Sequence, residues 1–170
     1  MSQATNKVKW CLDKAQKELK DKGSHRGLVQ AKPDLEKAND FIKKAEHYLK
    51  ATEYLKEGNF SDISASTVFY SIYHCLLAIA EKFGYGSRNQ DCTFALIYSL
   101  IEDGKIDFDV NILNRIASLD QKQGDEKTTV GVREQFQYGT ELSLKDSLYE
   151  ELIDLAKNVL GKTKEILKTS

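Results

Sequence analysis

The stretch SDISASTVFYSIYHCLLAIAEKF, residues 61–83, decides the fold of this chain. Its apolar side chains do not form a single stripe, because at helical spacing they fall on every side of the cylinder. They are Ile63, Ala65, Val68, Phe69, Ile72, Tyr73, Cys75, Leu76, Leu77, Ile79, Ala80 and Phe83. A helix that is apolar all round has to be surrounded by other helices. We therefore expect residues 61–83 to form the buried central helix of a bundle.

Amphipathic segments on both sides of this stretch predict the surrounding helices. Apolar residues recur at spacings of three and four in residues 8–19, 35–55, 94–101, 110–119 and 144–167. Gly23 and Gly104 are typical helix ends, and Pro33-Asp34 and Ser61 are typical helix starts. No segment shows the period-two alternation of a strand. The sequence predicts an all-α, up-and-down bundle of about five to six helices.

Local start signals also place the later helices of the bundle. Asp107 or Asp109 is expected to begin the helix of residues 110–119, and Ser143 with Asp146 resembles a capping box for the last helix. The segment QKQGDEKTT, residues 121–129, contains no apolar side chain that burial could use to offset the entropy of ordering. We expect residues 121–131 to form a mobile loop.

Length and charge indicate one domain without a global attraction to nucleic acid. The 170 residues, 41% of them hydrophobic, suit a single domain, with residues 1–32 as an N-terminal helix and connector and 33–170 as the bundle core. Twenty-five basic and 26 acidic residues give a net charge of -1. Residues 1–32 nevertheless carry an excess of positive charge. A solvated basic helix and an RNA-contacting arm both fit that excess.

The sequence predicts a cytoplasmic protein that does not span a membrane. The uncharged run of residues 67–80 is shorter than the roughly 20 residues a transmembrane helix needs. The first ten residues, MSQATNKVKW, lack the apolar stretch of a secretory signal. The three cysteines, Cys11, Cys75 and Cys92, are odd in number and widely spaced. We expect them to be reduced thiols, with Cys75 buried.

The sequence carries no pattern for a cofactor or a metal. The ten glycines form neither GxGxxG nor GxxxxGK, the loops that cradle phosphates. His25, His47 and His74 are the three histidines, and none lies four residues from another histidine or a cysteine. There is also no nucleophile elbow or paired-carboxylate signature. We expect no cofactor and no metal.

Two groups of residues could still carry a function. Tyr70, Tyr73 and His74 bring polar groups into the expected central helix, and each polar group needs a partner if it is buried. Arg133 and Tyr138 lie in the segment of residues 130–139, where an arginine could hold phosphate and a tyrosine could stack on a base. One interpretation is a binding groove that all five residues line. The other is that they only complete the core and pack down the 130–139 segment.

The chain resembles the HEPN family of helical proteins, in particular its UPF0332-related branch. The resemblance is carried by Lys9-Trp-Cys11, Lys44-Ala-Glu46, Val68-Phe-Tyr-Ser-Ile-Tyr-His-Cys75 and Arg133 through Tyr138. Their order and spacing extend over nearly the whole chain. The resemblance implies a helical bundle that forms a homodimer, and in many members an RNA endonuclease toxin encoded beside a minimal nucleotidyltransferase.

In the nucleases of this family, the catalytic motif is an arginine followed after four to six residues by a histidine. Arg133 matches the arginine, but residues 134–139, EQFQYG, contain no histidine. The resemblance therefore implies a non-catalytic RNA-binding, nucleotide-binding or interaction module. An active ribonuclease using Arg133 with His74 or Tyr138 and a purely structural dimerisation module remain open.

Overall fold

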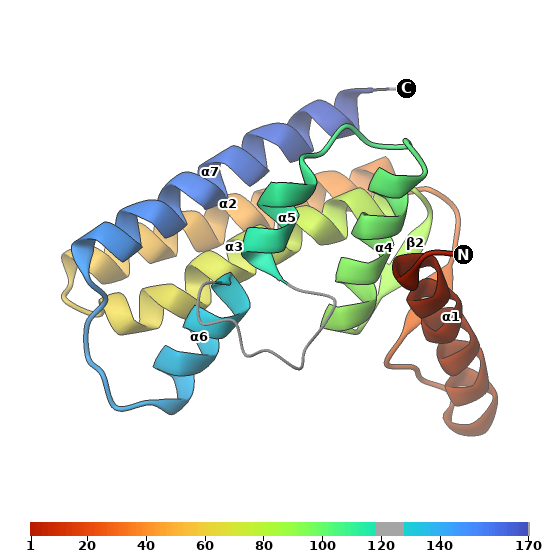
Figure 1. Cartoon of the computed structure of the whole chain (residues 1–170), viewed down its shortest axis with the longest axis horizontal. Coiled ribbons are helices and arrows are strands. Elements are labelled where there is room, and N and C mark those ends of the chain that lie inside the picture. Colours follow the sequence, from red (N-terminus) through yellow and green to blue (C-terminus); the bar gives the residue numbers. More distant parts are fainter. Residues whose placement is uncertain (118–127, 170) are drawn as a thin grey trace.

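The computed structural model of the chain describes residues 1–117 and 128–169, and this part is an all-α bundle, as the sequence predicts (Figure 1). Its helices are α1 Gln3–Lys22, α2 Leu35–Glu57, α3 Ser61–Lys82, α4 Gln90–Glu102, α5 Val110–Ile116, α6 Thr129–Tyr138 and α7 Asp146–Lys168. The long helices α2, α3 and α7 run side by side, and α1 stands at one end (Figure 1).

Helix α3 is the centre of the bundle. It packs against α2, α7, α6 and α4. It is also the one helix in the described residues that is long and apolar enough to cross a membrane, but 61% of its most apolar window is buried inside the protein. This burial is typical of a helix in the core of a bundle. The prediction of a central helix in residues 61–83 is confirmed, with the helix ending at Lys82.

Small polar side chains bring α3 close to α2. The Ser71 hydroxyl donates a hydrogen bond to the Ala45 carbonyl at 2.7 Å, and the Ser64 hydroxyl donates to the Thr52 carbonyl at 3.0 Å. Both serines are fully buried. A buried hydroxyl that donates to a backbone carbonyl of the neighbouring helix has its hydrogen-bond partner, and no second side chain has to fit between the two helices. The serines that interrupt the apolar pattern of α3 therefore mark its contact with α2.

One side of α3 is less enclosed than the sequence predicts. Ser66, Tyr70, Tyr73, His74 and Leu77 are only partly buried. They lie on one face because each follows another member of the set by three or four positions, starting from Ser66. Four of these side chains carry hydroxyl or imidazole groups. Burial of this face of α3 is therefore incomplete.

Most helix ends follow the local signals in the sequence. Gly23 ends α1 in the left-handed conformation, with φ of 72°, and the side chains of Asp34 and Asp109 cap α2 and α5. Two signals were wrong. The N-cap of α3 is Phe60, because the Ser61 hydroxyl instead accepts a hydrogen bond from the Leu144 backbone N–H at 2.9 Å. Helix α7 starts after Lys145 without a side-chain cap, so Ser143 does not form a capping box.

The expected mobile loop of residues 121–131 falls mostly outside the described residues. Its last part, from residue 128, is described and is not a loop. The Thr128 hydroxyl caps α6 by accepting a hydrogen bond from the Gly131 backbone N–H at 3.0 Å, and α6 begins at Thr129. A local cap at Thr128 therefore starts the helix before the polar run ends.

A short antiparallel ribbon, absent from the sequence prediction, joins β1 (Leu28–Gln30) to β2 (Tyr85–Ser87). Leu28 pairs with Ser87 and Gln30 pairs with Tyr85. Gly84 permits the approach, because its φ is +79° and a Cβ there would lie 2.5 Å from the Ala31 carbonyl oxygen. Strands of three residues are too short to show alternation, so the pairing depends on the packing of distant segments.

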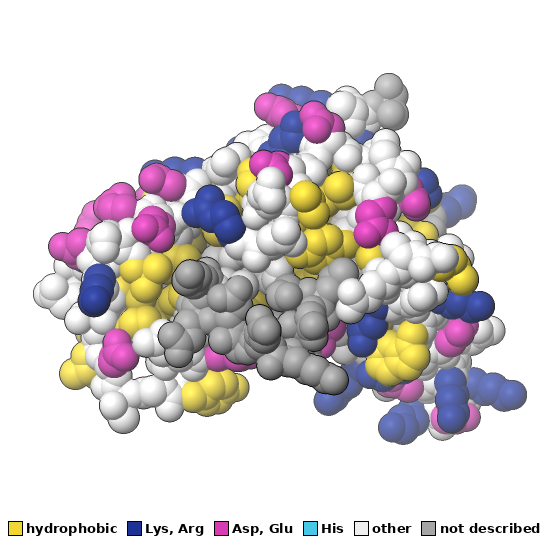
Figure 2. Space-filling model, in the orientation of Figure 1, with side chains coloured by type: hydrophobic (Ala, Val, Ile, Leu, Met, Phe, Trp, Pro, Cys, Tyr) yellow, Lys and Arg dark blue, Asp and Glu magenta, His cyan; other side chains and the backbone are white. Residues whose placement is uncertain are grey.

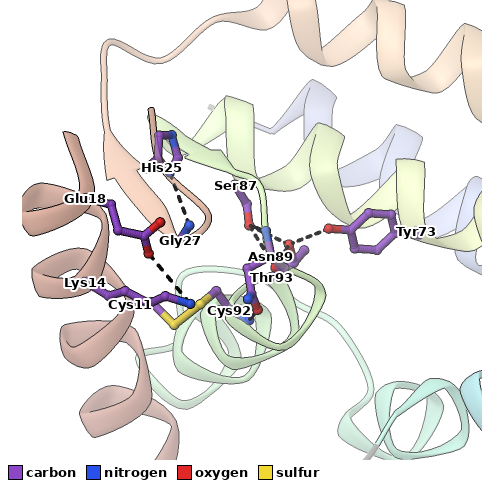
Figure 3. The surroundings of a disulfide bond; sticks show 10 residues. All are labelled: Cys11, Lys14, Glu18, His25, Gly27, Tyr73, Ser87, Asn89, Cys92 and Thr93. Carbon is purple, nitrogen blue, oxygen red and sulfur yellow. Dashed lines mark hydrogen bonds and ion pairs between the residues drawn. A yellow bond between two sulfur atoms is a disulfide. The ribbon is translucent and has the colours of Figure 1, made fainter. Parts of the chain in front are cut away.

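A disulfide bond between Cys11 and Cys92 corrects the prediction of three reduced thiols (Figure 3). The bond joins α1 to α4 across 81 positions of the chain, and the two Cα atoms lie 5.9 Å apart. Cys75 is a free, buried thiol, as predicted. Cysteine spacing reveals only local motifs such as CxxC. This pair could not be predicted from spacing, because it is brought together by two helices that pack side by side.

Candidate functional site

Five rings from two helices form one cluster, which we call the aromatic face. Helix α2 contributes Phe41 and Tyr48, and α3 contributes Tyr70, Tyr73 and His74. The His74 ring stacks on Tyr48 with centroids 5.2 Å apart, and the Tyr48 and Tyr70 rings lie 5.7 Å apart. All five residues are partly buried. The structure thus brings three of the predicted site residues together on one face.

The imidazole of His74 is held in one orientation. Its Nδ1 lies 2.6 Å from the Tyr70 carbonyl oxygen, which can only accept a hydrogen bond. Partial burial lowers the pKa of His74, and the positive charge of Lys44 lowers it further, against the opposite effect of that hydrogen bond. A neutral imidazole that donates from Nδ1 leaves Nε2 as an acceptor. His74 can therefore receive a hydrogen bond from a ligand.

Tyr73 belongs to a hydroxyl chain that runs toward the disulfide (Figure 3). Its hydroxyl is 3.1 Å from Oγ1 of Thr93, and that hydroxyl donates to Oγ of Ser87 at 2.7 Å. Burial raises the pKa of Tyr73. The phenol therefore stays protonated at neutral pH and is unsuited to act as a base. Its contacts make it a link between α3 and α4.

Arg133 lies on α6 with its guanidinium over the ring of Phe69. The Cζ atom is 4.5 Å from the ring centroid, and only 14% of the side chain is exposed. Its charged partner among the described residues is Glu134, with Nη2 and Oε1 3.6 Å apart. Its Nε is buried without a hydrogen-bond partner in the part of the chain that the structure describes. Arg133 thus holds a nearly buried charge whose donors are incompletely used.

Phe69 links Arg133 to the aromatic face. Its ring stacks with Tyr73 at 5.9 Å and meets Tyr70 edge-on at 5.4 Å. Tyr138, by contrast, is 79% exposed at the end of α6. It lies five positions after Arg133, so the two side chains leave α6 in directions about 140° apart. The structure joins Arg133, Tyr70 and Tyr73 through Phe69 and places Tyr138 apart from them.

Two lysines on α2 that were not predicted from the sequence belong to this region. Lys44 Nζ lies 5.5 Å from the Tyr48 ring centroid, and Lys37 Nζ lies 6.0 Å from the Phe41 centroid. Lys37 also forms an ion pair with the buried Glu81 at 2.8 Å. Each lysine is four positions before its ring, the spacing at which side chains of one helix meet. This four-residue spacing is the sequence signal from which the two lysine–ring contacts could have been predicted.

The chemistry available here is binding of an anion and stacking of a ring. The contacts of His74 are with α2 and α3, and none of those in the described residues reaches Arg133. The same part of the chain holds no group of three or more His, Cys, Asp or Glu able to bind a metal ion. An arginine, lysines and aromatic rings suit a phosphate-bearing ligand with a flat base.

Comparison of the chain with models of known protein families and with curated proteins finds no match.

Proposed function

We propose that the protein is a HEPN-like, non-catalytic module that binds RNA or a nucleotide through Arg133 and the aromatic face. One observation carries this proposal: the nearly buried guanidinium of Arg133, with Nε unbonded and a single carboxylate 3.6 Å away in the described residues. Burying a charge without full compensation costs free energy, and such costs concentrate at functional sites. A phosphate oxygen would supply the missing acceptor.

The neighbours of Arg133 support a ligand that also contains a base. The Phe69 ring lies against the Arg133 guanidinium and also contacts the rings of Tyr70 and Tyr73. Partly exposed tyrosine rings offer stacking surfaces to a nucleobase. Lys44 places a further positive charge over Tyr48 at the border of the same face. The combination favours a nucleotide or an unpaired segment of RNA over a simple anion.

We propose binding without cleavage because the described part of the site has no side chain suited to transfer a proton in RNA cleavage. RNA cleavage without a metal needs a group that moves a proton near neutral pH. Tyr73 has a raised pKa, and His74 is fixed by the Tyr70 carbonyl on another side of α3 from Phe69. The stretch after Arg133 holds no histidine, unlike the family's nuclease motif. Binding without cleavage is the function these residues support best.

The resemblance extends the proposal to a homodimer paired with a minimal nucleotidyltransferase, and the sequence predicts a location in the cytoplasm. The disulfide bears on the location, because such bonds persist mainly in oxidising compartments and are rare in the cytosol. Thiol trapping in cells of the natural host tests it: a reduced Cys11 and Cys92 pair supports the cytoplasm, and an oxidised pair speaks against it.

The direct test replaces Arg133 by methionine, which keeps an apolar stem on Phe69 and removes the charge. We expect affinity for ATP, measured by calorimetry, to fall about ten- to a hundredfold, since charge-assisted hydrogen bonds contribute about 1.5–3 kcal/mol. We expect stability to stay equal or rise by about 1 kcal/mol, because a partly unpaired buried charge is removed. A purely structural arginine would instead lower stability and leave affinity unchanged.

Arg115→Met is the matched control, because Arg115 is exposed on α5. It should leave both affinity and stability unchanged. The same samples are incubated with end-labelled RNA. Intact RNA supports the proposal, whereas cleavage that is lost in Arg133→Met or His74→Gln would overturn it in favour of an active ribonuclease. Equal ligand affinity of Arg133→Met and the natural protein would also overturn it.

A further inference from the structure

Helix α1 carries the one tryptophan of the chain on its outer side, between lysines. Trp10 is 50% exposed. Lys7 Nζ lies 4.2 Å from the indole centroid and Lys14 Nζ lies 5.2 Å from it. Lys7, Trp10, Lys14 and Lys17 are three or four positions apart and share one side of the helix. We call these four residues the outer face of α1.

The opposite side of α1 is fixed to the rest of the protein. Ala4, Val8, Cys11 and Ala15 are buried there, and Cys11 is bonded to Cys92 of α4. A Cβ on Gly27 would lie 2.7 Å from the Cys11 carbonyl oxygen, so the chain before β1 also approaches this side closely. Because the inner side of α1 packs against the protein, the outer face is oriented toward solvent. A ligand can reach it without any rearrangement of the core.

The charge around Trp10 is positive, although the whole protein has a net charge of -1. Six lysines of α1 are opposed by three acidic residues. One of these acids, Glu18, is already engaged: it lies 3.7 Å from Lys14 and accepts a hydrogen bond from the Arg26 backbone N–H at 3.1 Å. Figure 2 shows Lys and Arg side chains gathered over α1 around a hydrophobic patch.

We propose that the outer face of α1 is a second binding surface, specific for single-stranded nucleic acid. An indole ring accepts any unpaired base by stacking, and lysines beside it neutralise the phosphates on either side of that base. The face extends over about 15 Å from Lys7 to Lys17, enough for several successive nucleotides. In the complex the lysine ammonium groups leave the indole ring and bind phosphate oxygens instead. The ring is then free to stack on a base.

Other occupants fit this face less well. A duplex keeps its bases paired and stacked, so it offers the phosphates but nothing for the indole. An acidic peptide offers charge without a flat ring. A membrane surface would require a row of apolar side chains, whereas Trp10 is the one apolar member of the outer face. Single-stranded nucleic acid is the ligand that uses both the indole and the lysines.

This inference does not rest on the function proposed for Arg133, because the two sites use different residues on different helices. Trp10 is the only tryptophan, so its fluorescence reports on α1 alone. We expect an oligouridine of about ten nucleotides to quench this fluorescence in a saturable way, with a dissociation constant below about 0.1 mM at physiological salt.

The deciding variant is the double substitution Lys7→Gln and Lys14→Gln. We expect weaker binding by about tenfold or more and a salt dependence reduced by about 1.4 in log–log slope, because each lysine releases about 0.7 counterion from a single strand. Lys145→Gln with Lys168→Gln makes the same change of charge at two exposed positions elsewhere and should leave quenching unchanged. Trp10→Leu should weaken the binding of labelled RNA about fivefold or more, as loss of base stacking requires.

Each remaining outcome decides the matter. No quenching, or equal loss of binding in the control pair, would overturn the proposal. Quenching as strong by duplex RNA, by polyglutamate or by anionic vesicles would overturn the choice of ligand. Arg133→Met should leave Trp10 quenching intact, and the Lys7/Lys14 variant should leave ATP binding intact, so the failure of one site is distinguishable from the failure of the other.

Discussion

His74 lies among aromatic rings and within the electrostatic influence of Lys44, and this environment sets how it responds to pH. Its ring contacts Tyr48 and Phe41, and its Nδ1 bonds to the Tyr70 carbonyl. Burial is the main cause that lowers the pKa of His74. The folded state therefore binds a proton at His74 less readily than the unfolded chain does, whose histidines titrate near about 6.5.

The first prediction is a pH dependence of stability that His74 causes. Because the folded-state pKa is lowered, the unfolded chain binds more protons as pH falls below about 6.5, and stability decreases there. Urea unfolding between about pH 7.5 and 5 should show this loss, and His74→Gln should flatten it. His47→Gln is the control, because His47 is exposed on α2. An unchanged pH profile in His74→Gln would contradict the prediction.

At the scale of elements, a single hydroxyl joins the starts of two long helices. Ser61, the first residue of α3, is buried, and its Oγ accepts the hydrogen bond from the Leu144 backbone N–H. Leu144 lies just before α7 and is itself buried. The segment that leads into α7 is thus anchored to α3 rather than capped by its own side chains.

The second prediction is that Ser61→Ala lowers the free energy of unfolding by about 1–3 kcal/mol, because it leaves the Leu144 N–H buried without its partner. Chemical denaturation measures the change. Ser143→Ala should shift stability by less than about 0.5 kcal/mol, since Ser143 is exposed and caps no helix among the described residues. The reverse order of the two effects would show that Ser143 caps α7 in solution.

The signals for helix ends show which elements the sequence could predict. Asp34 and Asp109 cap their helices through hydrogen bonds to a backbone N–H two or three positions ahead, so the interaction lies within the local sequence. Ser61 is also a residue type that commonly caps helices, but it bonds to a residue 83 positions away. A local pattern can therefore fail where a distant backbone group takes up the side chain, as the Leu144 N–H does at Ser61.

At the scale of the whole molecule, the Cys11–Cys92 bond fastens the N-terminal helix to the bundle. Helix α1 packs against α4 and β1, and its buried inner side is short of large side chains: Ala4, Val8, Cys11 and Ala15. A crosslink between positions so far apart restricts the unfolded chain strongly, and such bonds typically stabilise proteins by about 2–4 kcal/mol.

The third prediction follows from the state of each thiol. Unfolded but unreduced protein should react with one equivalent of a thiol reagent, at Cys75, and reduced unfolded protein with three. In the native state Cys75 should react slowly, because it is buried and burial raises its pKa to about 12. Reduction should lower the free energy of unfolding by about 2–4 kcal/mol. Three reactive thiols before reduction would contradict the bond.

The candidate site was predictable to the extent that it lies on one helix. Tyr70, Tyr73 and His74 are within four positions of one another, so helical spacing alone puts them on one face. Spacing did not indicate that Arg133 rests on Phe69 or that Tyr138 points away from it. Those facts depend on how α6 docks against α3, which is set by the packing of both surfaces.

The sequence by itself determined the all-α class, the central helix at residues 61–83 and most helix ends, because periodicity and capping act over a few residues. Tertiary structure decided the Cys11–Cys92 bond, the β1–β2 ribbon and the partial exposure of the α3 face that carries Tyr70, Tyr73 and His74. Each of these joins or exposes segments far apart in the chain. Their formation depends on which surfaces pack together. The burial of apolar area that drives this packing is non-directional, so the residues of a short segment do not show which distant segment it will contact.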